Sequence, residues 1–143
     1  MNILMKQAAL VEEFEAFDSW EDRYARIIAL GRALPPLPEE HRTEENKVRG
    51  CSSTVWLHAD YVDGLVHFQA DSDAVIVRGL VALLLQVYSG HRPEEILAAP
   101  PEFIEELGLN QNLSANRANG LAAMVKQIKT YALAFQSQSQ NKD

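Results

Sequence analysis

The single cysteine of the chain, Cys51, is the side chain best suited to covalent chemistry. One sulfur can close no internal disulfide and build no thiolate metal cage. Gly50 before it makes the backbone permissive, and the hydroxyl run 52–54 after it competes for local backbone hydrogen bonds. Arg49 electrostatically favours a thiolate. The segment therefore predicts a nucleophilic sulfur presented at the tip of a loop.

A second interpretation of Cys51 stays open at this stage. Free cysteine is among the most frequently buried residue types, and it usually behaves as a small hydrophobic side chain. Composition alone favours this interpretation, because few cysteines are catalytic. Residues elsewhere in the chain that could stabilise a reactive sulfur would favour the nucleophilic interpretation over the buried one.

Arg117 is the residue that we pair with Cys51. A cation in the first turn of a helix opposes the helix dipole, so some other interaction must offset the cost. A nearby anion would do so, and the polar residues Asn116 and Asn119 with Gly120 make this helix start open enough to receive a thiolate, persulfide or carboxylate. A salt bridge between Arg117 and a surface acid is the alternative.

Other ionisable residues offer weaker chemistry. Asp71 and Asp73 precede an apolar segment, where acids that cap a helix explain them better than a pair of catalytic or metal-binding carboxylates. The four histidines, at positions 41, 58, 67 and 91, lack metal-ligand spacing and are predicted to be surface residues. No phosphate-binding glycine loop or Ser-His-Asp arrangement is present, and we expect no metal site.

Length and composition indicate one globular domain over residues 1–143. The chain has 47% hydrophobic and 23% charged residues, enough for a core without disulfides or metal. Its formal net charge of −7 argues against nucleic acid as a partner. The N-terminal residues resemble no secretory signal, no apolar stretch is long enough to span a membrane, and one unpaired cysteine fits the reducing cytoplasm.

Apolar periodicity predicts the elements that must position Cys51. Two amphipathic helices cover about residues 4–17 and 20–34, the second capped by Ser19 and ended by a proline pair. A proline-rich and charged stretch over 35–46 is expected to be a surface loop that leads to the cysteine.

Residues 55–70 are predicted to form a β-hairpin around the Asp63-Gly64 turn. Pairing Val62 with Leu65 places the apolar residues on one face and the polar ones on the other. Trp56 then falls on the polar face, where either a helix or loop covers it or a partner meets it.

The second half of the chain is predicted to be helical. A nearly all-apolar helix covers 74–88, short helices follow over 93–98 and 101–107, and Ser114 caps a final helix that runs to about Phe135. The polar tail 136–143 is expected to be frayed or disordered.

Three segments together resemble the SufE family of sulfur acceptors, including its CsdE branch. They are the cysteine segment 48–56, the segment 71–80 that begins Asp-Ser-Asp, and the segment 113–121 that contains Arg117. The likeness extends over nearly the whole chain, because the starts and ends of the second helix also match. Ser52 stands where family members often carry Gln or Glu, and Ala70 stands where Gly is common, but neither departure removes a chemically required group.

The resemblance implies an α+β fold in which a small antiparallel β-sheet packs against helices, as in iron–sulfur scaffold proteins of the IscU type. It also implies a partner, a pyridoxal-phosphate cysteine desulfurase of the SufS or CsdA type. Cys51 would accept persulfide sulfur from that enzyme, stimulate it, and pass the sulfur to an iron–sulfur assembly scaffold. The chain would then be an accessory sulfur-transfer protein rather than an enzyme, and a homodimer stays open.

The same resemblance gives the other residues expected roles. Arg117 would stabilise the sulfur anion, and Asp73 would position the cysteine loop. Gly50, Ser52 and Trp56 would contact the partner. Two other functions remain as alternatives: a thiol-based redox sensor, although no resolving cysteine is present, and a non-catalytic interaction module in which Cys51 is buried filler.

Overall fold

The computed structural model of the chain describes residues 1–141. Its elements are seven α-helices, one short 3-10 helix and two strands within these residues. The first half contains α1 (Ile3–Glu15), α2 (Trp20–Ala33), η1 (Glu39–His41), β1 (Val55–Val62) and β2 (Leu65–Ser72). The second half contains α3 (Val75–Tyr88), α4 (Pro93–Ala98), α5 (Glu102–Glu106), α6 (Leu109–Asn112) and α7 (Ala115–Asn141).

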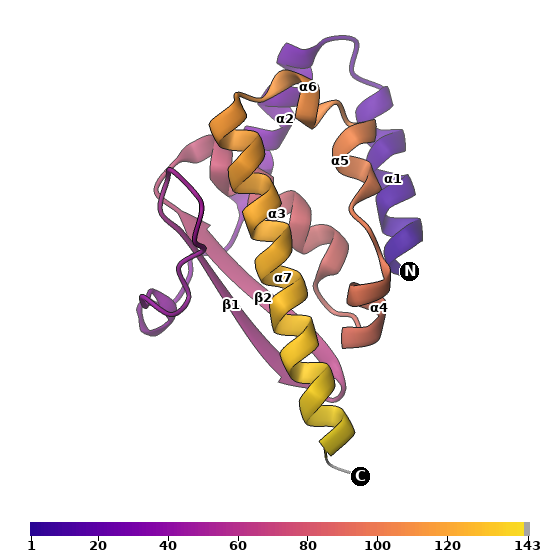
Figure 1. Cartoon of the computed structure of the whole chain (residues 1–143). Helices are drawn as coiled ribbons and strands as arrows, with labels where there is room; N and C mark the ends of the chain where they lie inside the picture. Colours follow the sequence, from indigo (N-terminus) through magenta and orange to yellow (C-terminus); the bar gives the residue numbers. More distant parts are fainter. Residues whose placement is uncertain (142–143) are drawn as a thin grey trace.

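Helix α3 lies at the centre of the molecule, and α1, α2, α7 and the hairpin surround it (Figure 1). Its residues are buried on nearly all sides, including Leu80, Leu83 and Leu84. An all-round apolar helix can be stable only when other elements cover every face of it. The predicted α+β class, with a small antiparallel sheet packed against helices, is therefore confirmed.

The hairpin has the predicted register. Val62 pairs with Leu65, and the alternation continues to Val55 opposite Ser72, so β2 is two residues longer than the predicted strand. Asp63 and Gly64 both have positive φ, of 53° and 81°, as the twist of a tight two-residue hairpin turn requires. Leu57, Val66 and other residues of the apolar face are fully buried.

Two glycines bring α2 and α3 unusually close. A Cβ on Gly79 would lie 2.2 Å from the carbonyl oxygen of Ile27, and one on Gly31 would lie 2.6 Å from the backbone nitrogen of Gly79. Neither position has room for any side chain. This contact sets the spacing of α2 and α3 near the C-terminal end of α2, where the connection toward Cys51 begins.

Three predictions about the elements were wrong or incomplete. Helix α7 continues through residues 136–141, which we expected to be frayed, and positions 142–143 of that tail lie outside the described residues. The short helix α6 was not predicted. His91 is buried rather than on the surface, because its backbone pairs with Val66 at the edge of the hairpin.

No helix within the described residues combines the length and the apolar character needed to cross a membrane. Helix α7 is the longest of the described helices, but its apolar residues are interspersed with polar ones, as in an amphipathic surface helix.

Candidate functional site

Cys51 lies on a short loop held at both ends. The amide of Val48 donates to the carbonyl of Val55 at 2.8 Å on one side, and Thr54 is bound to Asp73 on the other. Gly50 has a φ of 92°, a conformation that glycine adopts without strain. The loop therefore turns sharply just before the sulfur.

The thiol of Cys51 is turned toward the first turns of α7. Its Sγ donates to the carbonyl oxygen of Gly120 at 3.5 Å, and a Cβ on Gly120 would also be 3.5 Å from that sulfur. Cys51 is half-buried in this position. The sulfur is thus not presented freely at a loop tip as we predicted, because the loop folds back against the helix.

Burial raises the pKa of the Cys51 thiol above its ordinary value. The expectation that Arg49 would favour the thiolate is wrong for this structure, since desolvation is the cause that dominates. A thiol with a raised pKa is protonated near neutral pH, and the thiolate is the nucleophilic form. The raised pKa therefore lowers the fraction of thiolate at neutral pH below that of a solvated cysteine.

A cavity of about 420 Å³ opens beside Cys51, between the cysteine loop, α3 and the start of α7. Cys51, Ser52 and Arg117 all line this cavity, so the structure brings together three of the predicted site residues. The two residues from α3 are apolar, whereas α7 and its cap contribute both polar and apolar residues. The other lining residues are Ser53, Val77, Leu80, Ser114, Asn116, Gly120 and Met124. We call this the Cys51 pocket.

Arg117 is exposed and forms no ion pair within the described residues, so no surface acid offsets its place in the first turn of α7. Its backbone amide donates to the Ser114 hydroxyl at 3.3 Å, which confirms Ser114 as the predicted cap of the helix. Among the described residues that line the Cys51 pocket, Arg117 is the one that carries a charge at neutral pH, because the thiol of Cys51 is protonated.

Asp73 holds the far end of the cysteine loop. Its carboxylate accepts the amide of Thr54 at 3.1 Å, and its own amide donates to the Thr54 carbonyl at 3.3 Å. The hydroxyl of Ser72 donates to the same carbonyl at 2.8 Å. Asp73 therefore lies where it can position the loop, and it does so through the backbone three residues after Cys51.

The prediction that Asp71 and Asp73 cap helix α3 was wrong. The N-cap residue is Ala74, whose side chain cannot cap the helix, and the hydroxyl of Ser72 rather than either carboxylate accepts the Ala74 amide at 3.2 Å. Asp71 is instead buried on β2, where its carboxylate forms ion pairs with Arg42 and, at 2.9 Å, with Arg78. Arg42 comes from the long connection before Cys51, and Arg78 comes from the first turn of α3.

Arg42 and Arg78 are partners of Asp71 that the sequence did not predict. Arg78 also donates to the carbonyl of Leu34, the last residue before the connection, at 3.1 Å. Its signal in the sequence was a single cation inside an otherwise apolar helix, which indicates a buried anionic partner. The cluster of Arg42, Asp71 and Arg78 ties the connection, the hairpin and α3 together.

Trp56 lies on the polar face of the hairpin, as its strand parity predicted, and the connection before Cys51 covers it. The Arg42 guanidinium sits 5.1 Å from the centre of the ring, and the backbone of Lys47 pairs with Trp56. The indole Nε1 is buried and has no hydrogen-bond partner among the described residues. We expected Trp56 either to be covered by a helix or loop or to be exposed for a partner, and in this structure a loop covers it.

The histidines do not assemble a metal site. His41 and His58 stack with ring centroids 3.6 Å apart, and His58 contacts Asp60 at 3.0 Å. Within the described residues, however, no group of three or more His, Cys, Asp or Glu side chains is arranged to hold a metal ion.

Comparison with known proteins agrees with this architecture. A family model described as SufE, Fe-S metabolism associated domain, matches residues 8–132. The chain therefore belongs to the SufE family, and its role lies in sulfur transfer for iron–sulfur metabolism.

Individual relatives cover most of the chain. An uncharacterised SufE-like protein of Rhizobium etli is 49% identical over 128 residues, covering 86% of this chain and 86% of the relative. Another from Synechocystis is 44% identical over 129 residues, covering 90% of this chain and 81% of the relative. The solution structure of a hypothetical protein from Thermus thermophilus superposes with a TM-score of 0.77 at 25% identity, covering 92% and 96% of the two chains.

Proposed function

We propose that this protein accepts persulfide sulfur from a pyridoxal-phosphate cysteine desulfurase onto Cys51, stimulates that enzyme, and delivers the sulfur to iron–sulfur cluster assembly. The observation that carries the proposal is the Cys51 pocket, because the chain's one cysteine lines the same open cavity as Arg117, which forms no ion pair within residues 1–141. Membership of the SufE family supports the same chemistry. The desulfurase, not this chain, would hold the cofactor.

The transfer step balances without any added oxidant or reductant. The Cys51 thiolate attacks the outer sulfur of the donor's persulfide, and a new S–S bond forms at Cys51. The S–S bond of the donor breaks, and its electron pair leaves with the donor's cysteine sulfur. That sulfur takes up the proton that Cys51 gave up, so Cys51 becomes the persulfide and the donor becomes a free thiol.

The resting contact with Gly120 must be released for this reaction. Burial keeps the thiol protonated, and the helix lies against one side of the sulfur. A partner that draws the loop away from α7 would lower the pKa of Cys51 toward its ordinary value and expose the thiolate. Reactivity would then be confined to the complex.

Three further residues have supporting roles in the proposal. Arg117 stabilises the anionic sulfur as it forms, since its guanidinium has no competing carboxylate within the described part of the chain. Asp73 is a positioning residue that holds the loop through Thr54. Gly50 supplies the turn that lets the loop change its direction.

We assign contact with the desulfurase to the cysteine loop and to Trp56 on β1. Ser52 is exposed beside Cys51, so it would meet the desulfurase first. Trp56 would contribute only after Arg42 moves from its ring.

The decisive experiment incubates the protein with the desulfurase and L-cysteine labelled with radioactive sulfur. We expect a label on Cys51 that a reductant removes, and a gain of one sulfur by mass spectrometry. Cys51→Ser should take up no label, and Arg117→Ala should slow the transfer. Label that persists in Cys51→Ser would overturn the proposal. A redox sensor would instead react with peroxide and acquire no sulfur from the desulfurase.

A further inference from the structure

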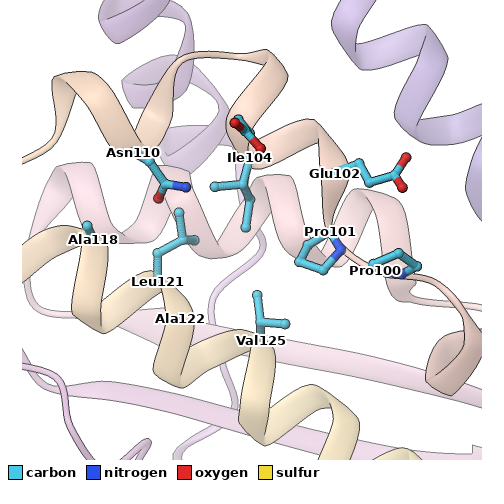
Figure 2. A pocket seen from close by; sticks show the side chains of 10 residues that line it. Pro100, Pro101, Glu102, Ile104, Asn110, Ala118, Leu121, Ala122 and Val125 are labelled. Atoms are coloured by element: carbon cyan, nitrogen blue, oxygen red, sulfur yellow. The ribbon is translucent and has the colours of Figure 1, made fainter.

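A second hollow of the molecule lies beside α7, on a different side of the helix from the Cys51 pocket. It is a groove of about 360 Å³ between α7 and the segment that contains α5 and α6. Figure 2 shows side chains of Ile104, Leu121 and Val125 pointing into this space, with Pro101 at its end. We call it the α5–α7 groove.

The floor of the α5–α7 groove is apolar. Leu121 and Ile104 are almost fully buried at 2% and 8% exposure, and Val125 is half-buried at the wall. The α7 wall is low because Ala118 and Ala122 have short side chains. A shallow apolar groove beside a helix is the surface that takes the apolar face of another helix.

The charge around the groove has one sign. Glu102 and Glu105 are the only ionisable side chains that line it, and Asn110 adds a polar amide. Both carboxylates are exposed, and neither forms an ion pair within residues 1–141. Unpaired carboxylates around an apolar floor complement an occupant that is apolar in the middle and cationic at its edges.

The α5–α7 groove and the Cys51 pocket lie next to each other, because the same turns of α7 line both. Arg117 and Gly120 line the Cys51 pocket, whereas the adjacent residues Ala118 and Leu121 line the groove. With 3.6 residues per turn, these two sets lie on neighbouring sides of the same turns of the helix. A partner seated over this part of α7 would therefore reach both hollows.

We propose that the α5–α7 groove is a docking site for a positively charged amphipathic helix of the cysteine desulfurase. The inference rests on the proposed function, because it assigns the groove to the same partner that delivers sulfur to Cys51. The groove supplies affinity and orientation, while Cys51 and Arg117 supply the chemistry. Its residues should therefore affect how tightly the partner binds and not the rate within the complex.

The test measures desulfurase-driven sulfur transfer as a function of the concentration of this protein. The double variant Glu102→Lys/Glu105→Lys should raise the apparent KM about tenfold and leave the rate at saturation unchanged. The wild-type KM should rise with ionic strength, and that of the double variant should not. Ala122→Phe, which fills the groove without changing its charge, should also raise KM.

The matched control is Glu12→Lys/Glu15→Lys, which makes the same charge change at exposed positions of α1. Its KM should stay within about twofold of wild type. Equal KM values for the groove variants and the wild type would overturn this inference while leaving the proposed function intact. Uptake of no sulfur by the wild type would overturn both. A circular dichroism melt of each variant shows that the comparison is between folded proteins.

Discussion

The sulfur of Cys51 and the carbonyl oxygen of Gly120 lie 3.5 Å apart, although 69 residues separate them in the sequence. This contact places the reactive group against a helix backbone, where it is half-buried and its pKa is raised. In the proposed function, this contact would have to be released before Cys51 could act beside its cavity.

Alkylation of Cys51 by iodoacetamide should be slow in the free protein at pH 7. Because burial raises the pKa of the thiol, the rate should rise with pH to a midpoint above that of an ordinary cysteine, about 8.5. The chain unfolded in urea provides the control, since its cysteine is solvated. Equal alkylation rates for the folded and unfolded chains at pH 7 would contradict this prediction.

Gly120→Leu should release the cysteine loop. A Cβ at this position lies at contact distance from Sγ, so the additional carbons of leucine would displace the thiol toward solvent. We expect alkylation at pH 7 to be about tenfold faster, because the displaced thiol is solvated and its pKa falls toward the ordinary cysteine value. Ala122→Leu is the matched control, because it makes a larger side chain on the side of α7 that faces the α5–α7 groove.

Asp71→Asn should destabilise the fold. The substitution leaves the Arg42 and Arg78 guanidinium groups without their shared carboxylate, which is only 11% exposed. We expect a loss of about 3 kcal/mol in the free energy of unfolding, measured by urea denaturation. Glu44→Gln, which removes a solvent-exposed ion pair with Lys47, should cost much less stability than Asp71→Asn. Similar losses for the two variants would argue against a buried cluster.

His91 should make stability depend on pH. Burial lowers the pKa of His91, with the charge of Lys6 acting in the same direction and Glu95 opposing it. The imidazole therefore takes up a proton more readily in the unfolded chain. This contribution to stability is present above the ordinary histidine pKa of about 6.5 and is lost as pH falls from there through the lowered folded pKa.

Urea denaturation at several values between about pH 5 and pH 8 measures this effect. His91→Gln should flatten the slope of unfolding free energy between about pH 5 and 7, because glutamine does not titrate. An unaltered slope in His91→Gln would show that other groups control the acid response.

Local patterns predicted most of the fold. The Asp63-Gly64 turn and the alternation of apolar residues fixed the hairpin register, because a shift of one residue would have placed the apolar set in water. The pairing of Cys51 with Arg117 in one cavity was also anticipated, from a cation placed against the helix dipole.

Long-range contacts account for what the sequence did not reveal. Asp71 looked like a cap by its position, but Arg42 and Arg78 reach it from distant segments and compete successfully for its carboxylate. The contact of Cys51 with Gly120 depends on how α7 packs against the cysteine loop. The spacing of residues within either segment does not predict that packing. Helix α6 is only four residues long, too short to show an apolar period.

The backbone contact between Gly31 and Gly79 has an evolutionary consequence. Neither glycine can be replaced alone, and no single compensating change elsewhere would restore the spacing of the two helices. Sequences that drift within this family should keep both positions even when the surrounding core exchanges one aliphatic residue for another. Variation in length should collect instead in the exposed stretch around Thr43 and Glu45, where the chain can lengthen without moving either helix.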